Sequence, residues 1–259
     1  MSGAQALLEL DELTRRLRRE CPWDREQDAR SIVPHTVEEA YELADAAQSG
    51  DDDRLLDELG DVLFQVHFLA LLLEERGAGD LAAVARHCRE KLIRRHPHVF
   101  GDTEVAGSAE VLRNWDDIKA GEEGREGGLF GEVPENLPAL LHARKVQRRA
   151  ASGGFDFDYG LDAPLDAVRG ELDELSAARD DRAAAFHELG DVLFAAVNVA
   201  RKLRVDPELA LRAASARFRD RVGAAETLAA REGRAWQDLG PDEQLALYAR
   251  ARLAAPESR

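Results

Sequence analysis

The chain of 259 residues contains only two cysteines and no apolar run long enough to cross a bilayer. Cys21 and Cys88 are 67 positions apart, which excludes a disulfide framework and fits a reducing compartment. The most apolar stretch, residues 62–73, has 12 residues and includes Gln65 and His67, far short of a membrane span. The N-terminal segment is charged throughout, unlike a signal peptide. We therefore expect a soluble, cytoplasmic protein with no membrane partner.

Basic residues are also too few to balance the acids. The chain has 35 Lys+Arg against 51 Asp+Glu, which gives a net charge of −16. Residues 1–140 carry −15 of this charge and residues 141–259 carry −1. An acid excess of this size makes nucleic acid a poor partner and a cation a better one.

Runs of β-branched residues are scarce and Asn-Gly hairpin signals are absent, which argues against a β-fold. Apolar residues between positions 59 and 73 recur at steps of three and four, as one buried face of a helix requires. Alanine-rich stretches at 81–95 and 209–222 also favour helix. The sequence therefore predicts an all-α fold.

The strongest organisational signal is an internal repeat. The motif ELGDVLF occupies residues 58–64 and again, unchanged, residues 188–194, at an offset of 130. Upstream, EEAYE at 38–42 matches GELDE at 170–174 at an offset of 132. Two copies of one helical module explain this order economically. A Gly-, Glu- and Pro-rich segment separates them, so the predicted organisation is an N-terminal module at 1–121, a linker at 122–137 and a C-terminal module at 138–259.

Each copy carries an E-x-x-E motif followed, after a spacer, by E-x-x-D. Residues three apart share one face of a helix, so two antiparallel helices can bring four carboxylates together. Such a cluster repels itself unless protons or cations neutralise it, and hard oxygen ligands suit Mg²⁺ or Mn²⁺. The predicted metal ligands are Glu39, Glu42, Glu58 and Asp61 in the first copy and Glu171, Glu174, Glu188 and Asp191 in the second.

Cationic side chains recur in the same register. Lys91 and Arg95 are four apart and match Arg217 and Arg221 at an offset of 126, a pattern that suits phosphate binding. No Gly-x-x-x-x-Gly-Lys-Ser/Thr loop is present, so the chain is not a P-loop enzyme. Some aromatic residues could stack on a base, although aromatic residues more often fill a core: Phe155, Phe157, Trp236 and Tyr248.

Alternative metal chemistries fit the motifs poorly. The segment HELGD at 187–191 begins like a zinc-protease motif, but Asp191 stands where the second histidine is needed. A di-iron carboxylate bundle would need Glu-x-x-His pairs, which these motifs do not supply. Two further hypotheses stay open: a module that binds Mg²⁺-nucleotide without turnover, and a structural helical dimer whose acids are solvated.

These motifs together resemble the MazG family over nearly the whole chain. The N-terminal copy contributes CPWDREQ at 21–27, EEAYE at 38–42, ELGDVLFQV at 58–66, RRHPHVF at 94–100 and NWDDIKAGE at 114–122. The C-terminal copy contributes GFDFD at 154–158, ELDEL at 171–175, HELGDVLFAAVNVAR at 187–201 and ARFRDR at 216–221.

The resemblance implies an all-α, Mg²⁺-dependent nucleoside triphosphate pyrophosphohydrolase that releases a nucleoside monophosphate and pyrophosphate and works as a homodimer. It implies metal ligands at the eight acids named above, phosphate contacts at Arg217 and Arg221, and a base contact near Tyr248. The second copy departs from the family pattern at Gly170, where a glutamate is usual. Arginines in the nearly neutral half should attract a polyanion best, so we expect catalysis at the C-terminal acids.

Overall fold

The computed structural model describes residues 1–108, 110–111, 114–115, 118, 128, 130, 133–156 and 160–254. Throughout these residues the regular structure is helical and contains no strand, which confirms the predicted all-α fold. The chain divides into two compact units, Met1–Lys119 and Ala120–Arg259. Most of the predicted linker falls outside the described residues.

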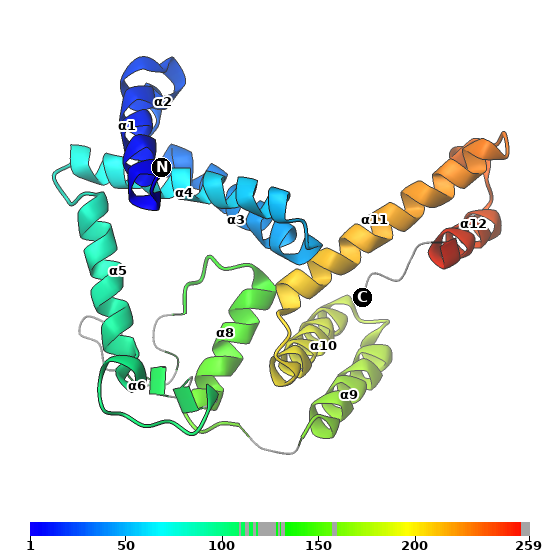
Figure 1. Cartoon of the computed structure of the whole chain (residues 1–259). Coiled ribbons are helices and arrows are strands. Elements are labelled where there is room, and N and C mark those ends of the chain that lie inside the picture. The colour runs from blue at the N-terminus through cyan, green and yellow to red at the C-terminus, as the bar shows by residue number, and fades with distance from the viewer. Residues whose placement is uncertain are drawn as a thin grey trace. The chain divides into compact units, whose positions relative to one another are not determined.

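Unit 1 is built around a pair of antiparallel helices, α3 and α4 (Figure 1). The turn between them uses Gly50, whose φ of 72° favours glycine, and Asp51 then caps α4 by accepting from the main-chain N–H of Arg54. The helices of the unit are α1 (Gly3–Glu20), α2 (Pro22–Glu26), α3 (Ala29–Ser49), α4 (Asp52–Glu75), α5 (Leu81–Arg95) and α6 (Pro97–Phe100).

The core of unit 1 lies between α3 and α4. Ile32, Phe68 and Leu72 form a buried cluster, with Phe64 packed against it. Phe68 has no exposed surface, and the guanidinium of Arg18 from α1 lies 5.9 Å from its ring centroid. The face that the sequence periodicity predicted is not the buried one, because Leu59 and Val66 are 49% and 41% exposed. The large buried apolar side chains of α4 are instead Phe68, Leu71 and Leu72, and Phe68 also meets a cationic side chain.

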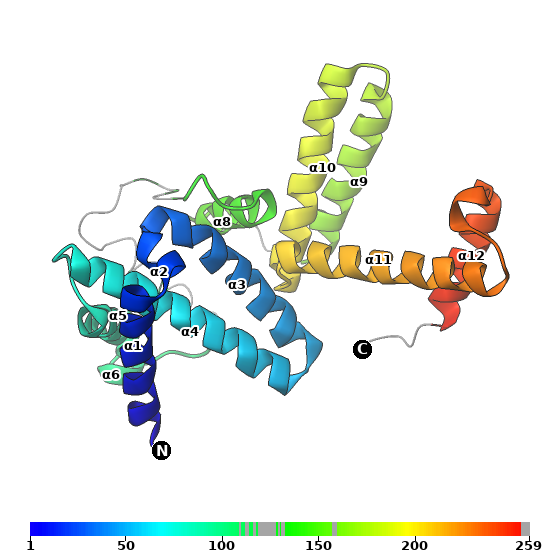
Figure 2. The ribbon, with the colours of Figure 1, turned by 90° about the horizontal axis from the view of Figure 1, so that it is seen from above.

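Unit 2 contains a second antiparallel pair, α9 and α10, from which α11 leads away in both views (Figures 1 and 2). The far end of α11 packs against α12 around Ala225, Ala229, Leu247 and Ala251. The elements are α8 (Ala139–Ser152), α9 (Asp162–Ala178), α10 (Arg182–Leu203), α11 (Pro207–Arg231), the 3-10 helix η1 (Trp236–Asp238) and α12 (Pro241–Ala254).

Helix boundaries follow the register of the sequence repeat. Asp51 caps α4 and Asp181 caps α10 at the same offset of 130 that separates the two ELGDVLF motifs. Asp80 caps α5 and Asp206 caps α11 at the offset of 126 that separates the basic pairs. The order α4, α5 in unit 1 therefore recurs as α10, α11 in unit 2, and Glu39 on α3 matches Glu171 on α9 at the offset of 132.

Helix α10 is long and apolar enough, by length and composition alone, to pass as a membrane span, and 6% of that stretch is buried. The core helix of a soluble protein passes the same test, so this is weak grounds for a membrane. Several of its apolar side chains are nevertheless exposed: Phe186, Leu189, Leu193 and Phe194.

Candidate metal site and adjoining cavity

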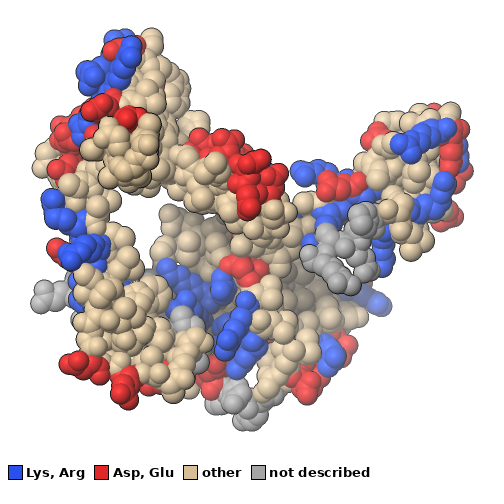
Figure 3. All heavy atoms as spheres, viewed as in Figure 1, with Lys and Arg blue, Asp and Glu red and all other residues tan. Residues whose placement is uncertain are grey.

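The predicted acids of unit 1 converge between α3 and α4. Oxygens of Glu39, Glu58 and Asp61 all lie within 4.8 Å of one another. Glu42 is close enough for its charge to act on Glu39 and Glu58. Acidic side chains also gather over the α3–α4 pair on the face seen in Figure 3, as the charge of −15 in residues 1–140 would suggest.

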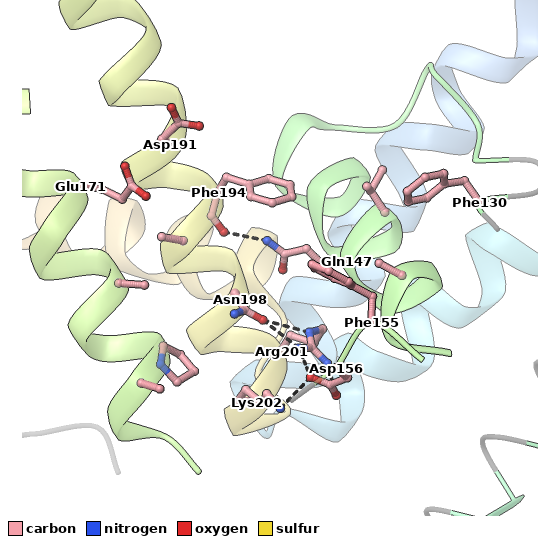
Figure 4. Close-up of a pocket in the computed structure, with 16 residues that line it drawn as sticks. Phe130, Gln147, Phe155, Asp156, Glu171, Asp191, Phe194, Asn198, Arg201 and Lys202 are labelled. Carbon is pink, nitrogen blue, oxygen red and sulfur yellow. Dashed lines mark hydrogen bonds and ion pairs between the residues drawn. The ribbon is translucent and has the colours of Figure 1, made fainter. Parts of the chain in front are cut away.

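The acids of unit 2 converge in the same way between α9 and α10. Oxygens of Glu171, Glu174 and Glu188 lie within 4.8 Å of one another. Asp191 projects from α10 beside Glu171 of α9 (Figure 4), and its charge acts on that carboxyl. Both predicted quartets are therefore brought together by a helix pair.

Each cluster holds more negative charge than it can neutralise by itself. Partial removal from water, followed by repulsion from neighbouring carboxylates, raises the pKa of Glu39, Glu58 and Glu171 above the usual 4.5. A divalent cation would relieve this repulsion. The donors are carboxylate oxygens without histidine or cysteine among them, which fits a hard cation such as Mg²⁺ or Mn²⁺.

In unit 2 the acids open onto a cavity of about 640 Å³, within the range typical of small-molecule sites. Figure 4 shows Glu171 and Asp191 at one end, Phe194 and Gln147 in the middle, and an ion-pair network at the other end. The lining also includes Phe130, Val146, Ala150, Phe155, Asp156, Ala163, Pro164, Ala167, Ala195, Asn198, Arg201 and Lys202.

The far end of the cavity is organised by Asp156. Arg201 holds this carboxylate with two hydrogen bonds of 3.1 and 3.0 Å, and the Lys202 ammonium lies 2.8 Å from it. Arg201 also donates to the side-chain oxygen of Asn198 at 3.1 and 2.8 Å. The network therefore fixes three side chains of the α10 end against the loop that follows α8.

Comparison with known proteins agrees with this arrangement. The family model for the "MazG nucleotide pyrophosphohydrolase domain" matches residues 27–100. Over 229 residues, 88% of this chain and 87% of the relative, the sequence is 42% identical to "Nucleoside triphosphate pyrophosphohydrolase/pyrophosphatase MazG" of Thermotoga maritima. It is also 42% identical to "Nucleoside triphosphate pyrophosphohydrolase" of Escherichia coli K12, over 82% of this chain and 83% of the relative. The chain belongs to the MazG family. The resemblance predicted from the sequence motifs is thereby confirmed.

The two units of this MazG-family chain differ at the cavity. At an offset of 130, Phe64, Phe68 and Leu72 of unit 1 stand where unit 2 has Phe194, Asn198 and Lys202. At an offset of 132, Ile32 stands where unit 2 has Pro164. Three of the unit 1 residues form the buried core cluster and Phe64 packs against it, whereas all four unit 2 residues line the cavity. Unit 1 therefore packs apolar side chains at the positions where unit 2 keeps an open, partly polar space.

The predicted phosphate-binding residues lie away from the acids of their own units. Arg217 and Arg221 lie along α11, which leads away from the α9–α10 pair, and neither lines the cavity (Figures 1 and 2). In unit 1, Lys91 and Arg95 lie at the end of α5. Arg95 is buried, with its guanidinium 5.7 Å from the Trp115 ring centroid.

The predicted base contacts are separated as well. Phe155 lines the same cavity as Glu171 and Asp191. Tyr248 instead packs against the α11–α12 core, 5.9 Å from the Phe218 ring. Trp236 packs against that core too, and Phe157 lies outside the described residues.

Sequence reasoning missed five polar residues of the cavity. The predicted site residues did not include Gln147, Asp156, Asn198, Arg201 and Lys202, although Asp156, Asn198 and Arg201 lie inside motifs shared with the family. A signal was present in the repeat register. A position that is apolar in one copy and polar in the other, such as Phe68 and Asn198, marks a place where the copies have different tasks.

The ion pairs at Asp156 predict a specific pH dependence. Hydrogen bonding from Arg201, with help from Lys202, lowers the pKa of Asp156 from 3.8 to about 2. The folded chain holds this proton less tightly than the unfolded chain, so the network stabilises the fold above pH 3.8 and loses its contribution as the pH falls towards 2. Asp156→Asn should therefore lower the midpoint of chemical denaturation clearly near neutral pH. The variant and the wild type should converge only as the pH falls to about 2, where Asp156 takes up its proton in the folded chain as well. If the denaturation midpoints of the variant and the wild type differed by the same amount at every pH, the ion pairs at Asp156 would not stabilise the fold as stated.

Proposed function

We propose that the chain is a Mg²⁺-dependent nucleoside triphosphate pyrophosphohydrolase. It would convert a ribo- or deoxyribonucleoside triphosphate and water into the nucleoside monophosphate and pyrophosphate. The observation that carries the proposal is the acid quartet of unit 2, which opens directly onto a cavity large enough for a nucleoside. The printed names of the Thermotoga and Escherichia relatives support the same activity.

Each part of this reaction has a candidate residue in unit 2. Glu171, Glu174, Glu188 and Asp191 would hold Mg²⁺ and serve as the catalytic group. Mg²⁺, once bound, neutralises charge on the phosphates and on the transition state. A carboxylate of the cluster takes a proton from water, whose oxygen forms a bond to the α-phosphorus. The bond from that phosphorus to the bridging oxygen breaks, and pyrophosphate leaves with the electron pair.

We also propose that the chain consists of two tandem MazG modules with different roles, at 1–121 and 138–259. Both have a quartet of acids, but at unit 1 the positions matching the cavity belong to the core. The C-terminal module is then the catalytic one. The N-terminal module keeps its metal ligands Glu39, Glu42, Glu58 and Asp61 for a structural, regulatory or weakly catalytic role.

The proposed enzyme is a homodimer of the cytoplasm. Exposed apolar side chains on α9 and α10, such as Leu172 and Leu189, offer a surface for a second copy to cover. Arg217 and Arg221 lie on α11, which leads away from the acids of their own unit, and a partner subunit could supply such cations. Cys21 and Cys88 are both free, as expected in a reducing compartment.

Product analysis tests the proposal. The protein is incubated with each nucleoside triphosphate and Mg²⁺, and the products are separated by chromatography. We expect monophosphate and pyrophosphate in equal amounts, and no turnover once EDTA has removed the metal. Nucleoside diphosphate with orthophosphate would contradict the proposal. Binding without any product would instead favour the nucleotide-sensing module.

A further inference from the structure

The cavity of unit 2 contains two carboxamide side chains whose orientation is fixed by their partners. Arg201 can only donate, so the Asn198 atom that receives its two hydrogen bonds is the oxygen. The main-chain oxygen of Phe194 can only accept, so the Gln147 atom 2.7 Å from it is the nitrogen. Neither amide can turn over without losing these bonds.

The remaining atom of each amide has no partner among the described residues. The Asn198 nitrogen is left with its N–H groups unused, in a side chain that lines the cavity. Gln147 is only 8% exposed. Its side-chain oxygen is buried and accepts no hydrogen bond in the described part of the chain. An unpaired buried acceptor costs folding free energy, so it indicates a wall shaped for a polar ligand and not for packing.

Aromatic rings complete the lining. Phe155 and Phe194 both border the cavity and are 68% and 45% exposed, so the lining offers aromatic as well as polar surface to a planar ligand. The acids at the near end would hold the phosphates of a nucleotide through a metal. The Asp156–Arg201–Lys202 network closes the far end, where its charges already neutralise one another in part. The nucleobase of such a nucleotide would lie between the acids and this network, where it would meet Asn198.

From this geometry we infer that Asn198 is a specificity-determining residue, which donates a hydrogen bond from its side-chain nitrogen to an acceptor on the nucleobase. Arg201 and Asp156 are positioning residues, since Asp156 holds Arg201 and Arg201 holds the Asn198 oxygen. The inference rests on the proposed function and adds the place where the base is read. Unit 1 has Phe68 at the matching position and should not discriminate between bases.

The test compares the binding of nucleoside monophosphates that differ only in their base. The full chain, with Mg²⁺, is titrated with AMP, GMP, CMP and UMP by calorimetry. Asn198→Asp keeps oxygens toward Arg201 and removes the N–H donor, and Asn198→Ala removes the whole amide. Asn136→Ala is the matched control, because Asn136 is exposed and does not line the cavity. Circular dichroism establishes that each variant is folded.

The wild type should discriminate between the four bases. Both Asn198 variants should bind the monophosphate with the preferred base about three- to tenfold more weakly, so the four Kd values should lie closer together. Asn136→Ala should leave the differences between the four Kd values unchanged. An equal loss for all four bases, an unchanged spread, or a wild type without preference would overturn the inference.

Pyrophosphate release, measured on the same preparations, separates the two claims. If the wild type releases pyrophosphate but the Asn198 variants keep its base preference, the inference is overturned and the proposed function stands. No release, together with base-selective binding that Asn198→Asp abolishes, overturns the proposed function and supports the inference.

Discussion

Glu171→Gln should lower kcat for pyrophosphate release by about a hundredfold or more, whereas Glu39→Gln should leave it close to the wild-type value. Both substitutions keep the size of the side chain and remove one negative charge from an acid cluster. Glu171 lies within 4.8 Å of Glu174 and Glu188 and also borders the cavity. Glu39 has the equivalent neighbours in unit 1, where residues at the cavity-matching positions are packed into the core.

The two variants are controls for each other. Each lowers the repulsion within its own cluster, so each should fold at least as well as the wild type in the absence of metal. Activity is measured as the initial rate of pyrophosphate release at saturating Mg²⁺, and melting temperatures are recorded alongside. An equal loss of activity in both variants would remove the assignment of catalysis to the C-terminal module.

Phe68→Ala should destabilise unit 1 by about 3–5 kcal/mol, the range seen when a buried phenylalanine is truncated. The Phe68 ring has no exposed surface, packs with Ile32 and Leu72, and lies beneath the Arg18 guanidinium. Truncation removes these contacts and leaves a void next to a charged group. The same position in unit 2 is Asn198, which lines the cavity, so packing at this site is specific to unit 1.

Phe186→Ala is the matched control for this prediction. Phe186 also lies on the second helix of a pair, α10, but it is 75% exposed in the single chain. In a sample dilute enough to keep the chain monomeric, its truncation should change stability by less than about 0.5 kcal/mol. Urea denaturation followed by circular dichroism measures both variants. A Phe68→Ala midpoint equal to that of Phe186→Ala would show that the α3–α4 core does not depend on this ring.

The acid clusters could be predicted from sequence because helix geometry determines each pair of acids and only the pairing of two helices had to be inferred. Glu58 and Asp61 are three residues apart, so any helix through them places both carboxylates on one face. Because both copies contain the E-x-x-E motif followed by the E-x-x-D motif, the two helices that carry these motifs were expected to pair in each copy. The family and the all-α fold followed from the same motifs.

The cavity could not be predicted this way, because it depends on what fills the space and not on spacing. Phe68 and Asn198 occupy the same register in copies that share ELGDVLF, yet one is core and the other lines an open site. The direction of α11 was equally inaccessible. Arg204, with a φ of 58°, ends α10 in a left-handed conformation and starts the turn into α11, which carries Arg217 and Arg221 away from the acids. Spacing along α11 predicted that the two arginines share a face, but not where that face lies.

The most direct test of the central claim is hydrolysis of a nucleoside triphosphate in water labelled with oxygen-18, by the wild type and by Glu171→Gln. Attack of water on the α-phosphorus places the label in the monophosphate and none in pyrophosphate, as mass spectrometry of the two products would measure. We predict this pattern for the wild type, with the labelled product almost absent for Glu171→Gln. Label in pyrophosphate, or undiminished labelling of the monophosphate by Glu171→Gln, would contradict hydrolysis at the C-terminal acids.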